Sequence, residues 1–197
     1  MHQLIFPDIK GTWGHVNLAT EALSTEEPNP LLDPDVSRLW KADIHRKHQI
    51  DFSYGGYLED RSRLWRGSYL QPGCAWHLGI DYTVPEGTPV RLPFDATLRT
   101  LSLCPEKWGW GGKAVFQLPS GLFAIFGHLD LGVSSLGSRF SAGDLIGTVA
   151  PSERNGGWAP HLHVQFVSRR LDPDAVDGYS ALYPGIERDF PLPKRLA

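Results

Sequence analysis

Glycine and proline divide the middle of this chain into short apolar segments, and this spacing constrains the fold more than any other feature. The chain has 21 Gly and 16 Pro among 197 residues, a composition that favours short strands and many turns over long helices. Residues 119–121, between two such segments, have the composition of a hairpin turn, and residues 141–144 that of another tight loop, so the strands should pair antiparallel. We therefore predict an all-β fold built on an antiparallel, sandwich-like sheet. The segments of strand length are residues 75–84, 88–92, 97–103, 113–118, 122–126, 145–150 and 161–167.

The length of the chain suits one domain with extensions. A chain of 197 residues can bury a sizeable core but is short for two domains. We place the main domain at residues 61–170, after an irregular, proline-interrupted extension over residues 1–60 and before a tail over residues 171–197. A short helix capped by Asp33 or Asp35 is expected in the extension, because apolar residues recur at helical spacing, at Val36, Leu39, Trp40 and Ile44.

Charge and composition exclude several classes of protein. The chain has 19 Lys+Arg and 22 Asp+Glu, a net charge of -3, so we expect no nucleic-acid partner. It has no segment long and apolar enough to predict a membrane span. The first residues show no basic region followed by an apolar run, so we expect no secretory signal and a cytoplasmic location. Cys74 and Cys104 allow either one disulfide or two free thiols.

Two histidines mark the chemical centre of the chain. His161 and His163 stand two apart at the start of an apolar, strand-like segment. Alternate side chains of a strand share one face, so the two lie about 6.6 Å apart along the strand. Both could reach one metal ion or one substrate atom, and their spacing alone does not say which of them reaches it.

A second polar pair, His77 and Asp81, stands four residues apart. The β-branched residues and proline that follow favour a strand, on which the pair would lie about 13 Å apart. The two can contact one ion only if the chain bends, and Gly79 permits such a bend. One carboxylate and two histidines form the three-ligand set of a catalytic zinc site, and they suit zinc better than calcium or magnesium.

A zinc site of this kind also needs a group that accepts a proton from water. The chain contains no His-Glu-x-x-His motif, so histidines must take this role. His128 and the remaining member of the 161/163 pair are the available bases. Zinc lowers the pKa of bound water to about 7, close to that of an unperturbed imidazole.

Four motifs occur in order: His-Leu-Gly-Ile-Asp from His77, Phe-Gly-His-Leu from Phe126, Gly-Asp-Leu-Ile-Gly-Thr-Val from Gly143 and Pro-His-Leu-His-Val-Gln-Phe from Pro160. Together they resemble the M23 family of zinc metallopeptidases, of the lysostaphin and LytM type, over residues 65–167. The resemblance implies a LytM-like sheet with the metal in a groove and one zinc per chain. Members of the family cut peptide bonds of bacterial peptidoglycan. The roles it implies are zinc ligation by His77, Asp81 and His163 and catalysis by His128 and His161.

The approach to the last motif departs from the family pattern. Asn155-Gly156-Gly157-Trp158-Ala159 replaces the usual serine-threonine-glycine, and Phe126 stands where tyrosine is usual. This form is similar to the M23-like module of fusions with a small-molecule kinase and a class III aminotransferase. The substrate is therefore expected to be a peptidoglycan-type peptide or a smaller soluble amide. Trp158, Asn155 and Trp110 are the candidate substrate-binding residues.

Two classes of function fit these motifs. The first is a zinc-dependent peptidase that hydrolyses an amide bond with activated water. The second is a zinc-stabilised binding or regulatory module with the same fold and no turnover. His128 and His161 favour the enzyme, because a module that only binds has no chemical need for them. The N-terminal extension is expected either to cover one end of the groove or to plug it.

Overall fold

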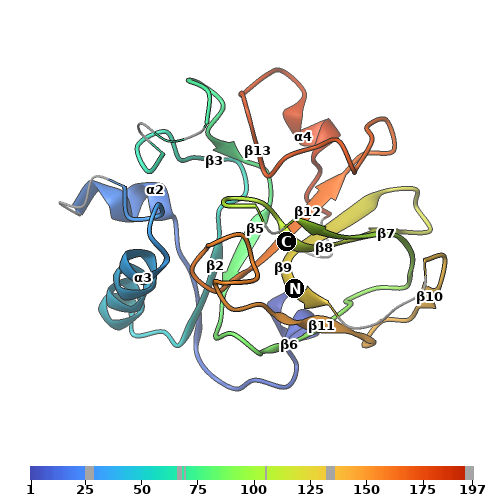
Figure 1. Cartoon of the computed structure of the whole chain (residues 1–197), viewed down its shortest axis with the longest axis horizontal. Helices are drawn as coiled ribbons and strands as arrows, with labels where there is room; N and C mark the ends of the chain where they lie inside the picture. Colours follow the sequence, from blue (N-terminus) through green and yellow to red (C-terminus); the bar gives the residue numbers. More distant parts are fainter. Residues whose placement is uncertain (25–28, 66–67, 69, 105, 132–135, 194–197) are drawn as a thin grey trace.

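A computed structural model of the chain describes residues 1–24, 29–65, 68, 70–104, 106–131 and 136–193, so the last residues of the predicted tail lie outside the described part. The fold is mostly β, with one ten-stranded sheet and one three-stranded sheet (Figure 1). The strands are β1 (Trp13–His15), β2 (Phe52–Gly55), β3 (Glu59–Asp60), β4 (Trp76–His77), β5 (Ile80–Thr83), β6 (Pro89–Arg91), β7 (Ala96–Cys104), β8 (Gly111–Gln117), β9 (Phe123–Leu131), β10 (Arg139–Phe140), β11 (Leu145–Val149), β12 (Leu162–Val167) and β13 (Tyr179–Ser180). The helices are α1 (His2–Ile5), α2 (Leu18–Glu21), the 3-10 turn η1 (Ala22–Ser24), α3 (Pro34–His48) and α4 (Ile186–Asp189).

The centre of the large sheet is antiparallel, as the turns predicted. Its strands follow the order β1-β2-β5-β12-β9-β8-β7-β10, and β11 pairs with both β9 and β6. The sheet is nevertheless mixed, because β1 pairs parallel with β2. Parallel neighbours need a long crossover connection, and here the connection contains α2 and α3. Both helices lie on the side of the molecule opposite β7 and β10 (Figure 1).

Local sequence signals explain the elements that were predicted. Every predicted apolar segment contains a strand, and the turn at residues 119–121 joins β8 to β9. Helix α3 begins after Asp33, whose side chain accepts hydrogen bonds from the backbone of Asp35 and Val36. It ends at Gln49, which adopts a left-handed conformation. The short strands β1, β2, β3, β10 and β13 were not predicted, because strands of two to four residues are too short to show a hydrophobic period.

The hydrophobic core includes the first residues of the chain. Ile5 and Phe6 are almost fully buried, and they belong to the same cluster as Phe126 and Leu162 of the central strands. The region that looked like an irregular extension therefore contributes to the core of the sheet. Both cysteines are free thiols. In the part of the chain that the structure describes, no helix has the length and hydrophobicity of a membrane span.

We expect that Phe6→Ala will lower the free energy of unfolding by about 3–5 kcal/mol, the usual cost of truncating a buried aromatic side chain. Urea denaturation measures the change. Leu4→Ala is the matched control, because Leu4 is 53% exposed and its truncation should cost about 0.5 kcal/mol or less. Equal effects of the two substitutions would show that residues 1–6 do not stabilise the sheet.

Candidate metal centre and active site

The chain bends between His77 and Asp81, as the spacing of the pair predicted. His77 ends β4 in the small sheet, whereas Asp81 lies on β5 in the large sheet. Gly79 lies between the two strands, where a Cβ atom would stand 2.8 Å from the carbonyl oxygen of Val164 and would overlap the ring of His163. The missing side chain lets His163 approach the bend, so the three residues meet.

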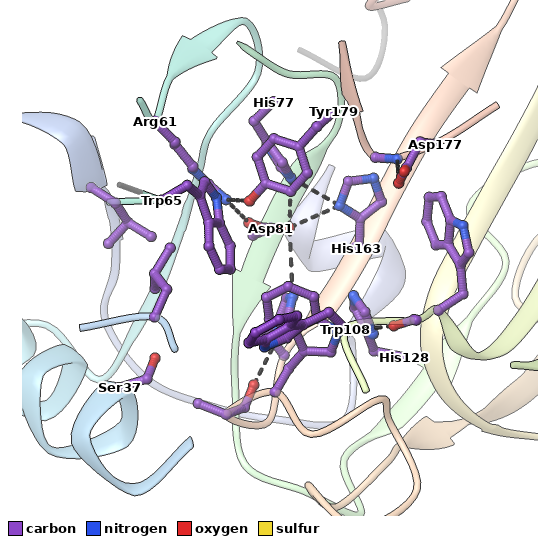
Figure 2. A pocket seen from close by; sticks show the side chains of 18 of the residues that line it. Ser37, Arg61, Trp65, His77, Asp81, Trp108, His128, His163, Asp177 and Tyr179 are labelled. Atoms are coloured by element: carbon purple, nitrogen blue, oxygen red, sulfur yellow. Dashed lines mark hydrogen bonds and ion pairs between the residues drawn. The ribbon is translucent and has the colours of Figure 1, made fainter. Parts of the chain in front are cut away.

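His77, Asp81 and His163 form a buried triad of ligand type, which we call the metal triad. His77 Nε2 lies 3.0 Å from His163 Nδ1 and 3.3 Å from Asp81 Oδ1, and His163 Nδ1 lies 3.0 Å from Asp81 Oδ1 (Figure 2). In a tetrahedral zinc site the bonds from zinc to nitrogen and oxygen are about 2.0–2.1 Å long, so two ligand atoms lie about 3.3 Å apart. The metal triad therefore fits a zinc ion.

Hydrogen bonds behind the metal triad fix which nitrogens face one another. His77 Nδ1–H donates to the carbonyl oxygen of Gly56 over 3.0 Å, and His163 Nε2–H donates to Gln165 Oε1 over 3.1 Å. Burial, with a contribution from Arg61, lowers the pKa of His77 to about 4, so this ring is neutral at pH 7. The two facing nitrogens then both carry lone pairs, and a cation bound between them satisfies both.

Arg61 holds the other oxygen of Asp81. Its Nη1–H groups donate to Asp81 Oδ2 over 2.8 Å and to the hydroxyl oxygen of Tyr179 over 3.1 Å, and Glu59 lies 3.4 Å from Nη2. Burial alone would raise the pKa of Asp81, but the neighbouring His77 and Arg61 lower it well below its usual range. Asp81 is thus a carboxylate that keeps Oδ1 directed toward the two histidines.

His128 reaches the site from an irregular point in β9. Its φ of +63° is left-handed, which is uncommon for a residue other than glycine. The pairing of β8 with β9 shifts register at the same place, between Gly112 and Ala114, as in a β-bulge. His128 Nδ1–H donates to the carbonyl oxygen of Asn155 over 2.9 Å, which leaves Nε2 as the acceptor nitrogen. A local distortion therefore directs this side chain.

His161 stands beside His128, with ring centroids 4.4 Å apart. Its Nδ1–H donates to the carbonyl oxygen of Ala159 over 2.7 Å, and its Nε2 lies 3.8 Å from Asp81 Oδ1. Burial lowers the pKa of His128 to about 3, and burial and the adjacent His128 lower that of His161 well below its usual range. Two neutral imidazoles with unprotonated Nε2 atoms therefore accompany the metal triad.

The five predicted histidine and aspartate residues line one pocket with a cavity of about 50 Å³ (Figure 2). Trp110 and Trp158 also line it, whereas Asn155 lies behind the wall, where its side chain bonds the backbone of Trp158 on both sides. The substrate-binding roles of these three residues stay a prediction. Other parts of the wall come from the N-terminal region (Leu18, Leu31, Ser37 and Lys41), from the start of the predicted main domain (Arg61 and Trp65) and from the tail (Asp177, Gly178 and Tyr179).

Sequence reasoning missed four residues around the site. Gln165 could have been found, because it stands two residues after His163 and shares its face of β12. Arg61, Lys41 and Tyr179 had no such signal, since they come from regions without a recognisable motif. Only the folded chain brings these three side chains to the pocket.

The fold and site define a metallopeptidase of the M23 type, and the chain belongs to peptidase family M23: the family model, "Peptidase family M23", matches residues 75–177. Peptidases of this family use zinc. The chain is 31% identical over 108 residues to "DD-carboxypeptidase/endopeptidase Mpg" of Neisseria meningitidis serogroup B, a match that covers 55% of this chain and 23% of the relative. The chain thus spans about a quarter of the length of the curated relatives it matches.

Solved structures of the family are similar at lower identity. The catalytic domain of lysostaphin from Staphylococcus simulans is 21% identical, with a TM-score of 0.45 over 57% of this chain and 80% of that one. The catalytic domain of the prophage-encoded M23 protein EnpA from Enterococcus faecalis is 22% identical, with a TM-score of 0.45 over 59% of this chain and 86% of that one.

We expect purified protein to hold about one zinc ion per chain and to lose it in His77→Ala, Asp81→Ala and His163→Ala, because each variant removes one ligand. Gly79→Ala should also lose zinc, since its methyl group displaces the ring of His163. Elemental analysis after dialysis measures the metal. His15→Ala, which changes an exposed histidine on β1, is the control, and full occupancy in all three ligand variants would refute the site.

The metal-free protein should lose stability in mild acid. Burial lowers the pKa of His77, His128 and His161 in the folded state, so below pH 6.5 the unfolded chain binds more protons than the folded one. Stability should then fall as the pH falls, by up to about 1.4 kcal/mol per pH unit for each histidine. Chelator-treated protein should unfold at lower urea at pH 5 than at pH 7. A midpoint that does not change with pH would contradict this expectation.

Proposed function

We propose that this chain is a zinc-dependent hydrolase that cleaves a peptide or amide bond with activated water. One observation carries the proposal: two neutral histidines, His128 and His161, stand beside a metal triad whose ligand atoms have the spacing of a zinc site. Membership of a peptidase family supports the same reaction class. The products would be one carboxylic acid and one amine.

The residues of the site divide this chemistry between them. Zinc held by His77, Asp81 and His163 would supply Lewis acidity, which makes water nucleophilic near neutral pH. His128 and His161 each hold Nδ1–H on a backbone carbonyl, so each Nε2 can accept a proton from water and return it to the leaving amine. In the metal-free chain, their lowered pKa values leave both Nε2 atoms unprotonated at pH 7.

The proposed substrate is a small or soluble amide. The cavity of about 50 Å³ has room for only a few water molecules, and binding pockets for drug-sized ligands are about 300–1,000 Å³. Side chains of α2 and α3 and the indole of Trp158 line this cavity. The form of residues 155–163 supports a relation to the M23-like module of kinase–aminotransferase fusions, and with it a cytoplasmic location.

His128→Ala and His161→Ala should keep zinc and reduce turnover by roughly 10² to 10⁴, the range for loss of a general acid or base. The measurement pairs zinc content with the rate of amine release from an amide substrate. Trp65→Phe is a control that changes the pocket wall without touching a proton carrier. Loss of zinc from either variant would show that the substituted histidine is a zinc ligand and not a base.

We expect the zinc-loaded full chain to release amine from small N-acylated amino-acid amides and little or none from intact peptidoglycan sacculi, because a crosslinked polymer does not fit the narrow pocket. Pentaglycine provides an intermediate, unbranched substrate. Mass spectrometry of the products identifies the bond that is cut. Efficient lysis of sacculi would refute the small-substrate proposal and leave the hydrolase itself standing.

The second candidate is a zinc-stabilised binding module without turnover. It is favoured by the extension, which supplies Leu18, Leu31 and Ser37 to the pocket wall and could act as a plug. Deleting residues 1–60 cannot separate these cases, because Ile5 and Phe6 are part of the core. Zinc binding by the full chain with no cleavage of any amide in the panel would select the module.

A further inference from the structure

Lys41 has an environment that the hydrolase mechanism does not explain. It lies on α3, is only 7% exposed, and lines the same pocket as the metal triad and the two catalytic histidines. Within the described residues its ammonium makes no hydrogen bond or ion pair. Lys47 on the same helix, by contrast, is largely exposed and pairs with Glu21 over 2.9 Å. A buried, unpaired ammonium is costly unless a partner of opposite charge is present.

The acidic groups that face this pocket have other partners. Asp81 accepts a hydrogen bond from Arg61 through Oδ2, and its Oδ1 faces the two histidines of the metal triad. Asp177 accepts a hydrogen bond from the backbone N–H of Gly178 over 2.6 Å. Since Arg61 is already paired with Asp81 and Glu59, Lys41 and a bound zinc ion leave the pocket with an excess of positive charge.

Lys41 lies in the same pocket as the two bases. Lys41, His128 and His161 all line this cavity of about 50 Å³. A small substrate that occupies the cavity can therefore contact the ammonium and both bases. Ser37 lines the pocket from one turn earlier on α3, so a hydroxyl and an ammonium occupy the same helix face.

We propose that Lys41 binds a carboxylate of the substrate, so that the enzyme selects small amides that carry a free carboxylate close to the bond that is cut. This inference rests on the proposed hydrolase. A carboxylate fits better than a phosphate, because a single ammonium with one hydroxyl balances one negative charge and the cavity is small. Helix α3, which lies before the residues matched by the family model, would then set the substrate specificity of this chain.

The test compares three probes by isothermal titration calorimetry on the zinc-loaded full chain carrying His128→Ala, which should keep zinc but turn over too slowly to hydrolyse the amide probe during the titration: N-acetylglycine, N-acetylglycinamide and inorganic phosphate. The first two have nearly the same size and differ in the charged group. Because a hydrogen bond to a charged group is strong, the carboxylate should bind about 10- to 100-fold more tightly than the amide. Lys41→Met and Lys41→Gln should remove most of this preference, and Lys47→Met should retain it.

Three outcomes would overturn the proposal: equal binding of the first two probes, an unchanged preference in both Lys41 variants, or tighter binding of phosphate than of N-acetylglycine. An unchanged preference would place the anion on the metal instead of on Lys41. Zinc content and circular dichroism establish that each variant is folded, and glutamine keeps a polar group if methionine is not tolerated. The titration requires no turnover, so failure of the hydrolase appears separately, as loss of zinc binding or of amide cleavage.

Discussion

The carboxylate of Asp81 is the interaction on which the site and the surrounding fold both depend. One oxygen faces the two histidines of the metal triad, and the other accepts a hydrogen bond from Arg61. Arg61 in turn contacts Glu59 of β3 and Tyr179 of β13, so the buried charges connect the small sheet to the large one. Removal of the carboxylate would leave a buried arginine with one acidic partner fewer, which is costly. The metal chemistry and the packing of the two sheets therefore share one side chain.

The N-terminal region gives the site walls that the family motifs do not supply. Because β1 and β2 are parallel, the chain must cross between them, and this crossover carries α3 to the pocket. β2 pairs with β5, and β1 forms the edge of the large sheet beside β2, so both ends of the crossover are held by this sheet. Residues that resemble a loose extension in the sequence therefore have a fixed place beside the reactive groups.

The sequence predicted the parts of this structure that depend on local patterns. The antiparallel strands, the hairpin at residues 119–121 and the cap of α3 follow from periodicity and turn chemistry. The bend at Gly79 followed from the requirement that His77 and Asp81 contact one ion. The parallel pair, the small sheet and the roles of Arg61 and Tyr179 could not be predicted, because they depend on contacts between residues up to 118 positions apart. The left-handed conformation of His128 was equally hidden, since it arises from a register shift between two strands.

The residues that position the metal ligands are different from those that shape part of the pocket wall. One metal site can therefore serve different substrates. His163 stands directly opposite Asp81 on β5 and Gly127 on β9, so strand register alone sets the position of two ligands. The absence of a side chain at Gly127 lets Trp110 pack against β9 next to His163. None of these contacts involves α3 or Trp158. Changes in those walls can therefore alter the entrance and its charge while the ligand atoms stay in place, and the metal triad alone does not determine the substrate.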